Sequence, residues 1–256
     1  MCFSFAGNRK RQPAEKEMMV FLAKLAQRDK QPEIMDQPGL EFTQHQAALR
    51  ELARINWISA SDAILWKPIQ RLALEKSDRP MRVLDLATGG GDVPIRLHAR
   101  ARRGGVPITF AGADLSPSAI EFARQQASQS NAGVEFFRLD ALNAPLPTDY
   151  DVITCSLFLH HLETDQAVDL LRRMGQAARL MVLINDLIRS RLGYVLAYVG
   201  TRVLTRSDIV RYDGPQSVRA AFTIPEAQRL AERAGLQNAT ISWHWPFRFL
   251  LCWRRS

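Results

Sequence analysis

The stretch from residue 83 to residue 94 reads Val-Leu-Asp-Leu-Ala-Thr-Gly-Gly-Gly-Asp-Val-Pro and could bind a nucleotide-like ligand. Branched apolar residues over 81–86 predict a buried strand, three glycines follow it, and a helical pattern begins at Asp92. Glycine has no Cβ, so a glycine turn lets the backbone approach a ligand closely. A strand, a glycine turn and a helix N-terminus together predict a nucleotide-type binding loop, without identifying the nucleotide.

Three further carboxylates follow apolar runs of strand type: Asp114, Asp140 and Asp186. In open α/β sheets, ligands bind at the carboxyl ends of the parallel strands. We therefore expect these three side chains to lie at the same edge of a sheet as the glycine turn.

Strand signals alternate with helical signals through the middle of the chain. The predicted strands cover 81–86, 108–113, 134–139, 150–156 and 179–185, and the helical segments between them cover about 92–102, 117–129 and 165–177. This alternation implies right-handed crossovers and a parallel sheet that is covered on both faces. Two more strands, 238–245 and 248–254, are joined around Pro246 and predict an antiparallel hairpin. The fold class is therefore α/β, with a Rossmann-like, seven-stranded and mostly parallel sheet.

Helical patterns also precede this sheet. They cover about 17–27, a segment around Leu52, and 60–72, where Pro68 is expected to kink or divide the helix. We expect residues 1–79 to form a helical N-terminal extension that caps the substrate, behind a poorly ordered lead-in at 1–15. Residues 80–256 are expected to form the main domain.

A helical insertion is predicted within the main domain at about 187–222. Its apolar stripe over 192–203 is flanked by arginines, and a loop with Asp, Gly and Pro at 213–215 follows. We expect the stripe to be buried against the sheet, although a basic amphipathic helix can also lie on a membrane surface. A helix at about 225–234 comes next, with Gly235 as its C-cap.

The glycine stretch resembles the first motif of the class I S-adenosylmethionine-dependent methyltransferases, in which an acidic residue ends the strand before a Gly-x-Gly turn. The resemblance implies that the loop Ala87-Thr88-Gly89, with Gly91, lies against the methionine part of the cofactor. Asp85 would support the loop and bind the ammonium group of the cofactor, directly or through water.

Two later motifs follow in the order typical of this family, which the chain resembles over about residues 80–186. Asp114 and Leu115, within Gly-Ala-Asp-Leu-Ser, resemble the acidic ribose motif. Asp140 and Ala141, within Arg-Leu-Asp-Ala-Leu, resemble the adenine motif. The resemblance implies that Asp114 accepts hydrogen bonds from the ribose hydroxyls and that Asp140 accepts one from the adenine amino group.

Residues 149–162 resemble the fourth-strand motif of the family, and similar His-His-Leu runs occur in methyltransferases of quinones and related small aromatic compounds. The resemblance places Ser156 beside the cofactor and His160 and His161 beside the methyl group. Imidazole has the pKa range of a general base, so either histidine is a candidate, with a structural role as the alternative. Asp186 is a second candidate, as the base, as the group that orients a histidine, or as a helix cap.

These motifs predict an enzyme that uses S-adenosylmethionine and releases S-adenosylhomocysteine. Residues 156–159 read Ser-Leu-Phe-Leu and lack the Asn/Asp-Pro-Pro-Tyr/Phe motif, which argues against DNA or glutamine as the acceptor. Residues 33–56 resemble the lead-in of bacterial methyltransferases of polyketide and phenolic-lipid pathways. This favours O-methylation of a phenolic, polyketide-derived or quinone-type compound. C-methylation of a quinone precursor and methylation of RNA stay open as alternatives.

A nicotinamide dehydrogenase is the chief rival interpretation of the glycine turn. The dinucleotide fingerprint needs a third glycine three residues after the second, where this chain has Pro94. The chain also lacks the Tyr-x-x-x-Lys pair of short-chain dehydrogenases near this motif. The turn therefore favours the methyltransferase interpretation.

Composition limits the expected partners and cellular location of the protein. The formal charge of +8 comes from scattered basic residues and indicates a solvated basic surface, with RNA or a membrane as possible anionic partners. Cys2, Cys155 and Cys252 lie far apart, so neither a disulfide framework nor a metal site is predicted. With no signal peptide and no apolar window of about 20 residues, a cytoplasmic location is expected.

Overall fold

The computed structural model describes residues 25–36, 42–58, 61–76 and 79–255, and its centre is one seven-stranded sheet. The strands are β1 (Met81–Leu86), β2 (Ile108–Asp114), β3 (Val134–Arg138), β4 (Val152–Ser156), β5 (Met181–Leu187), β6 (Thr240–His244) and β7 (Arg248–Arg254). Their order is β3-β2-β1-β4-β5-β7-β6. The first five strands run parallel, whereas β7 runs antiparallel to β5 and β6 antiparallel to β7. The predicted α/β fold with a C-terminal hairpin is confirmed.

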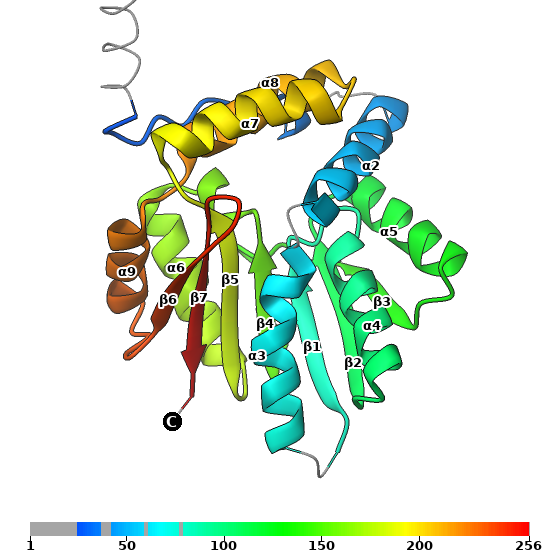
Figure 1. Ribbon diagram of the computed structural model, residues 1–256. Helices are drawn as coiled ribbons and strands as arrows, with labels where there is room; N and C mark the ends of the chain where they lie inside the picture. Colours follow the sequence, from blue (N-terminus) through cyan, green and yellow to red (C-terminus); the bar gives the residue numbers. More distant parts are fainter. Residues whose placement is uncertain (1–24, 37–41, 59–60, 77–78, 256) are drawn as a thin grey trace, which may run out of the picture.

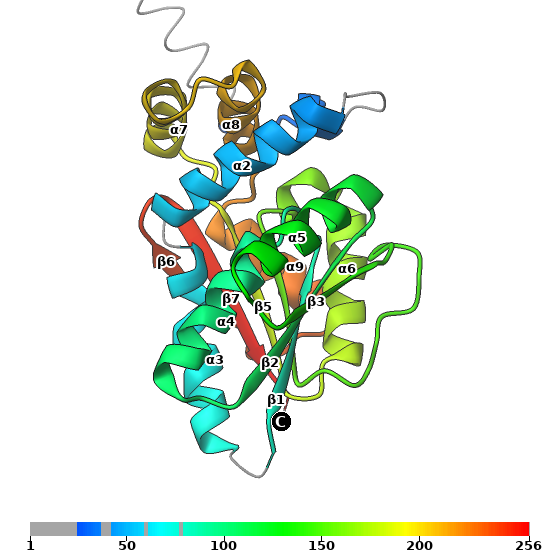
Figure 2. The same cartoon turned by 90° about the vertical axis from the view of Figure 1, so that its right-hand side faces the viewer.

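Helices pack on both faces of this sheet (Figure 2). Their bounds are α3 (Ser61–Glu75), α4 (Asp92–Gly104), α5 (Pro117–Gln129), α6 (Thr164–Ala177) and α9 (Ile224–Arg233). Successive side chains of a strand point to opposite faces, and β1 shows this directly. Val83 packs in a buried cluster with residues of α3 and α4, whereas Leu84 packs in a second cluster with residues of α6 and α9. The two clusters fix the sheet between its helical layers.

A further layer lies across the carboxyl edge of the parallel strands (Figure 1). It consists of α2 (Phe42–Ile58), α7 (Arg191–Leu204) and α8 (Asp208–Ala220). Two short 3₁₀ turns, η1 (Ile34–Asp36) and η2 (Leu159–His161), lie beside it. The layer comes from the N-terminal part of the chain and from the insertion after β5, and it covers the edge at which ligands of such sheets bind.

Several local signals in the sequence are borne out. Ser116 caps α5 by accepting a hydrogen bond from the amide of Ala119, and Pro117 occupies the first turn. The C-cap of α9 is Ala234 and not Gly235 as expected, and Gly235 follows it in a left-handed conformation. The helix expected at 17–27 falls mostly outside the described residues, as does the expected lead-in at 1–15, and residues 25–27 form a turn. Pro68 does not divide α3, which is continuous through it.

The loop expected at 213–215 is wrong, because these residues lie inside α8. Gly214 faces α7 so closely that a Cβ on it would approach Thr201 Cγ2 to 2.6 Å. The glycine therefore serves close packing of two helices rather than a turn, and Ser207 caps the helix upstream. Tertiary packing overrides the low helix propensity of Gly and Pro here.

The apolar stripe of α7 is not buried against the sheet as expected. Leu192, Val195, Val199 and Val203 are 66%, 51%, 50% and 76% exposed on the outer side of the helix. The faces of α7 and α8 that meet carry small residues instead. Among the described residues, no helix is long and apolar enough to cross a bilayer.

Gly112→Ala is expected to destabilise the protein. A Cβ on this residue of β2 would lie 2.6 Å from the Phe136 ring and 2.9 Å from Thr88 Cγ2. Overpacking of this kind typically lowers the free energy of unfolding by about 1–3 kcal/mol. Gly200→Ala in α7 is the matched control, because a Cβ there meets nothing within 4 Å and alanine favours a helix. Urea unfolding of both variants checks this, and equal stability of the two would contradict it.

Candidate functional site

The end of β1 carries a carboxyl group that is held from two sides. Asp85 is 2% exposed, and its two oxygens accept hydrogen bonds from the hydroxyls of Thr88, at 2.8 Å, and Thr154, at 2.6 Å. Burial raises the pKa of Asp85 to about 7, against the two hydroxyls that lower it, and the nearby charges of Asp92 and Asp114 add to the rise. The site therefore holds a carboxylate whose charge is not balanced by a cationic side chain.

The glycine loop is tied to the next strand through Asp114. The amide of Gly89 donates to Asp114 Oδ2 at 2.8 Å, and the amide of Ser116 donates to Oδ1 at 2.9 Å. Gly91 has φ +74°, and a Cβ there would lie 2.6 Å from the Phe136 ring. Only glycine fits this position, so the loop backbone stays bare and close to the sheet edge.

A chamber of about 390 Å³ lies above the glycine loop, under α2, α7 and α8. Its walls include five residues predicted to bind the cofactor: Asp85, Ala87, Thr88, Gly89 and Ser156. The Ser156 hydroxyl is buried and has no hydrogen-bond partner within the described part of the chain. Buried polar groups are almost always paired, so this hydroxyl together with the open backbone of the loop fits a polar ligand such as an amino-acid–nucleoside cofactor.

The remaining predicted cofactor residues do not line the chamber. They are Gly91, Asp114, Leu115, Asp140 and Ala141. Asp140 accepts three hydrogen bonds in its own turn, from the Asn143 side chain and from the amides of Leu142 and Asn143. These hydrogen bonds lower the pKa of Asp140. The structure thus brings the residues predicted for the methionine end to the chamber, apart from Gly91, and leaves those predicted for the ribose and the adenine outside it.

His160 and Asp186 form a buried pair at the chamber wall. His160 Nδ1 lies 2.6 Å from Asp186 Oδ1, and the amide of His160 donates to Oδ2 at 3.1 Å. Burial raises the pKa of Asp186, but the charge of His160 and its hydrogen bond outweigh burial and hold the pKa below its usual value. The carboxylate thereby fixes the orientation of the imidazole and directs its Nε2 toward the chamber.

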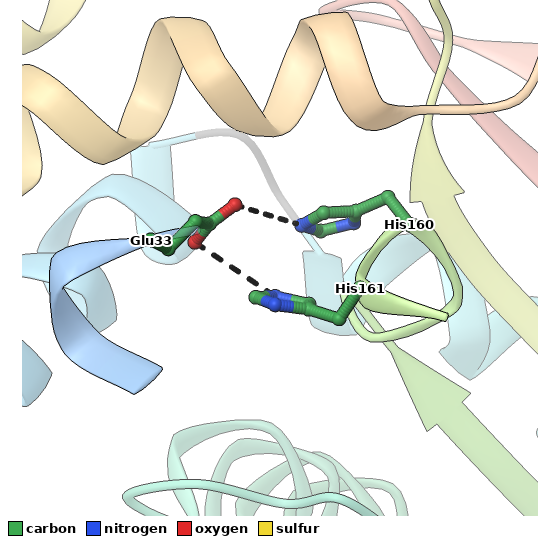
Figure 3. Close-up of side chains that lie close together, drawn as sticks. All are labelled: Glu33, His160 and His161. Carbon is green, nitrogen blue, oxygen red and sulfur yellow. Dashed lines mark ion pairs between the residues drawn. The ribbon is translucent and has the colours of Figure 1, made fainter. Parts of the chain in front are cut away.

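Glu33 joins these residues and was not predicted from the sequence. Its Oε1 lies 3.8 Å from His160 Nε2, and its Oε2 lies 3.9 Å from His161 Nε2 (Figure 3). The Ser217 hydroxyl of α8 donates to Glu33 Oε1 at 2.6 Å. No spacing in the sequence relates Glu33 to the His-His pair, so only the fold could reveal this contact.

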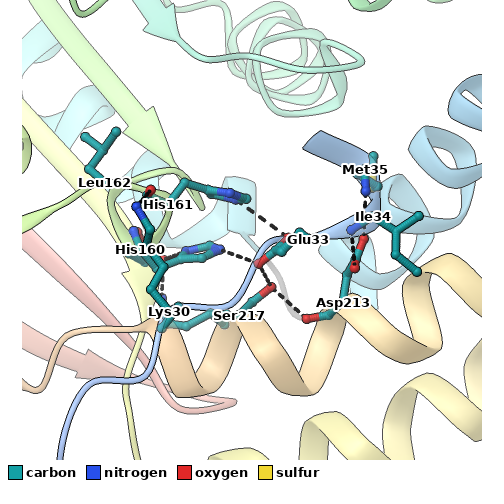
Figure 4. A network of polar contacts seen from close by, with 12 residues as sticks. Lys30, Glu33, Ile34, Met35, His160, His161, Leu162, Asp213 and Ser217 are labelled. Atoms are coloured by element: carbon teal, nitrogen blue, oxygen red, sulfur yellow. Dashed lines mark hydrogen bonds and ion pairs between the residues drawn. The ribbon is translucent and has the colours of Figure 1, made fainter. Parts of the chain in front are cut away.

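The segment that carries Glu33, residues 25–36, is called the strap here, and it is anchored at both ends (Figure 4). Arg28 and Lys30 donate to backbone carbonyls at and just after η2, at 2.6 to 3.1 Å. The amides of Ile34 and Met35 donate to the Asp213 carboxylate of α8, at 2.8 and 3.1 Å. The strap therefore joins the histidine turn to the helical layer and places Glu33 between them.

Known proteins are similar to this chain in sequence and in fold. A family model described as a methyltransferase domain matches residues 83–179. The demethylmenaquinone methyltransferase of Thermus thermophilus is 34% identical over 168 residues, which cover 61% of this chain and 73% of that enzyme. The chain belongs to the S-adenosylmethionine-dependent methyltransferases.

Further similarities agree with this family. The demethylmenaquinone methyltransferase of Deinococcus radiodurans and the ubiquinone biosynthesis O-methyltransferase of Thiobacillus denitrificans are each 30% identical. The alignments cover 60% and 63% of this chain, and 65% and 66% of those enzymes, which is just under two thirds of their length. The fold is shared with RosA from Streptomyces davawensis, an N,N-8-amino-8-demethyl-D-riboflavin dimethyltransferase. That similarity has a TM-score of 0.58 at 20% identity and covers 83% of this chain and 57% of that one.

Asp85→Asn is expected to change how stability depends on pH. The pKa of about 7 in the folded protein exceeds the ordinary value of 3.8, so the stability that the bound proton confers is lost as the pH rises through 7. Asparagine carries no such charge. From pH 5 to pH 8, the wild type is therefore expected to lose about 2–3 kcal/mol relative to the variant. Urea unfolding of the ligand-free proteins measures this difference. Asp208→Asn, at a side chain that is 98% exposed, is the control, and a wild-type curve parallel to that of Asp85→Asn would contradict the prediction.

Proposed function

We propose that this chain transfers the methyl group of S-adenosylmethionine to a hydroxyl oxygen of a small, largely apolar molecule. The observation that carries the proposal is that the glycine loop and the His160–Asp186 pair open into the same chamber. A group that binds the cofactor and a group that can activate an acceptor are thus within reach of one bound ligand pair. In the reaction, the sulfur–methyl bond breaks as the oxygen–methyl bond forms, and the hydroxyl loses its proton.

The cofactor is assigned to the chamber floor from the residues around it. The backbone at Gly89 and Gly91 would lie along the methionine part, and Asp85 would pair with the ammonium group that its unbalanced charge favours. Asp114, which accepts from the amides of Gly89 and Ser116 beside the loop, is assigned to the ribose hydroxyls. Asp140, with Leu115 and Ala141, is assigned to the adenine end.

The acceptor is assigned to the upper part of the chamber. Leu52 and Ile55 of α2, Leu196 of α7 and Val218 of α8 make this part apolar. A chamber of about 390 Å³ suits a molecule of drug size rather than a polynucleotide, which disfavours RNA. Relatives named for demethylmenaquinone and ubiquinone biosynthesis support a quinone-type or phenolic acceptor. We favour oxygen over carbon as the site of methylation because His160 and His161 line the chamber, with Asp186 bound to His160, and such a group can activate a hydroxyl.

The domain roles follow from the same layout. We assign α2, together with the 187–222 insertion that forms α7 and α8, to a cap over the acceptor. Residues 80–256 outside the insertion carry the cofactor. Helix α3 precedes residue 80, yet its apolar side packs in the core with β1, so the cap comprises the strap and α2 rather than all of 1–79.

His160→Asn is expected to lower kcat by at least about 100-fold, the range typical for loss of a group that activates the acceptor. Calorimetry should show that S-adenosylhomocysteine still binds the variant within about twofold of wild type, and that NAD binds neither protein. A methyl-transfer screen over phenols, quinols and alkylresorcinols provides the activity assay. His98→Asn, at a half-buried histidine of α4 that does not line the chamber, is the control and should leave turnover unchanged. Binding of NAD in place of S-adenosylhomocysteine would refute the proposed function.

We further propose that the exposed face of α7 rests on an anionic membrane surface from which the apolar acceptor enters. Its stripe of Leu192, Val195, Val199 and Val203 is flanked by arginines, and this combination is typical of helices that lie in a membrane interface. The net charge of +8 is opposite in sign to an anionic lipid surface.

The double variant Leu192→Asp and Val203→Asp is therefore expected to abolish co-sedimentation with phosphatidylglycerol vesicles. Leu74→Asp is the matched control, because Leu74 is also 66% exposed but lies on α3, away from the cap. Neutral phosphatidylcholine vesicles should bind the wild type more weakly. Equal binding of the double variant and the wild type would contradict this surface assignment.

A further inference from the structure

Three metal-ligating side chains converge in the chamber wall. Among the described residues, Glu33, His160 and His161 each offer one ligand atom, and these atoms lie within 4.8 Å of one another. The carboxylate comes from the strap, and both imidazoles come from η2 (Figure 3). The strap and η2 are far apart in the sequence, and the hydrogen bonds of Arg28 and Lys30 hold them together.

The two nitrogens of the His160 ring face two different carboxyl groups, those of Asp186 and Glu33. Asp186 is a carboxylate and can only accept, so the 2.6 Å contact requires the proton on His160 Nδ1. The other ring nitrogen, Nε2, faces Glu33 Oε1, which also accepts from the Ser217 hydroxyl. The separation of 3.8 Å between Nε2 and Oε1 is longer than a hydrogen bond. A gap of this length between two metal-ligating atoms has room for an ion bonded to both.

The spacing suits a cation bound by both groups. Zinc bonds to imidazole nitrogen and carboxylate oxygen are about 2.0–2.2 Å long, so two ligands of one ion lie roughly 3–4 Å apart. Glu33 Oε1 lies 3.8 Å from His160 Nε2 and Glu33 Oε2 lies 3.9 Å from His161 Nε2, so each imidazole has a carboxylate oxygen within this range.

The surrounding residues resemble the outer shell of a metal site. A histidine that binds a metal usually donates its other nitrogen to a carboxylate, as His160 does to Asp186. Ligating carboxylates are likewise hydrogen-bonded, as Glu33 is to Ser217 (Figure 4). Each group is thus held in place before any ion arrives.

We propose that Glu33, His160 and His161 bind a divalent transition-metal ion of the zinc type and leave one coordination position open to the chamber. Two histidines and one glutamate form a ligand set that holds zinc with an open position. The role of the open position rests on the proposed function: it takes the hydroxyl oxygen of the acceptor. The ion lowers the pKa of that hydroxyl, whose proton passes to solvent water.

The bound oxygen then forms its bond to the methyl carbon as the carbon–sulfur bond of the cofactor breaks. S-adenosylhomocysteine and a methyl ether result. Both Nε2 atoms are ligands in this arrangement, so the histidines activate the acceptor through the ion and not as bases.

The test measures ion binding without cofactor or acceptor. The full chain is stripped with a chelator, titrated with Zn²⁺ by calorimetry, and titrated with Co²⁺ by visible absorption. Wild type is expected to bind one equivalent and to give the cobalt bands typical of four-coordinate sites. Glu33→Gln and His161→Asn should each weaken Zn²⁺ binding by more than about 100-fold, and Asp186→Asn by about 10–100-fold. Glu163→Gln is the control, because this nearby carboxylate is 65% exposed and pairs with Lys30 instead.

The absence of stoichiometric uptake by the wild type, or equal affinity of wild type and Glu33→Gln, would overturn the proposal. Binding of S-adenosylhomocysteine verifies that each variant is folded. If a variant does not fold, the cobalt spectrum of the wild type alone tests whether a four-coordinate site is present. The two proposals fail separately. Full methyl transfer by metal-free protein would refute the metal proposal and support the proposed function. Ion binding without methyl transfer would support the metal site and refute the proposed function.

Discussion

The hydrogen bond between Asp186 and His160 is the interaction on which the arrangement of the η2 wall of the chamber depends. Asp186 stands near the carboxyl end of β5, between β4 and β7, where burial would penalise its charge if no donor were present. His160 and the amide of Leu187 supply the donors. The pairing holds η2 against β5, and the strap and α8 then pack onto η2.

The glycine-loop side of the chamber is built differently, because backbone as well as side chains forms its surface. Parallel strands bring their carboxyl ends to one edge, and Asp114 ties the glycine loop to the neighbouring strand there. Burial disfavours the ionised form of the Asp85 carboxyl and so raises its pKa. A cationic ligand would relieve that penalty, so the energy spent on burying Asp85 is recovered when the ligand binds.

The sheet and the glycine loop could be read from the sequence because their signals are local. Strand β1 and helix α5 begin and end where the apolar periodicity and the Ser116 cap predict. The helical layer of α2, α7 and α8 could not be predicted from local signals in the same way. Helix α8 forms because Gly214 packs against α7, and the stripe of α7 faces outward, so both features depend on partners that periodicity does not reveal. Glu33 was missed for the same reason, since a long-range contact between the strap and η2 brings it to His160.

The division of labour along the chain has an evolutionary consequence. The glycine loop and its ties to Asp114 and Ser116 lie within one continuous stretch of the chain, whereas the opposite wall of the chamber combines the strap, η2 and α8. Mutations in the strap or the insertion can therefore reshape that wall while the glycine loop keeps its own contacts. Proteins with this fold can therefore evolve toward new acceptors through mutations in these outer segments, while the loop that we assign to the methyl donor stays unchanged.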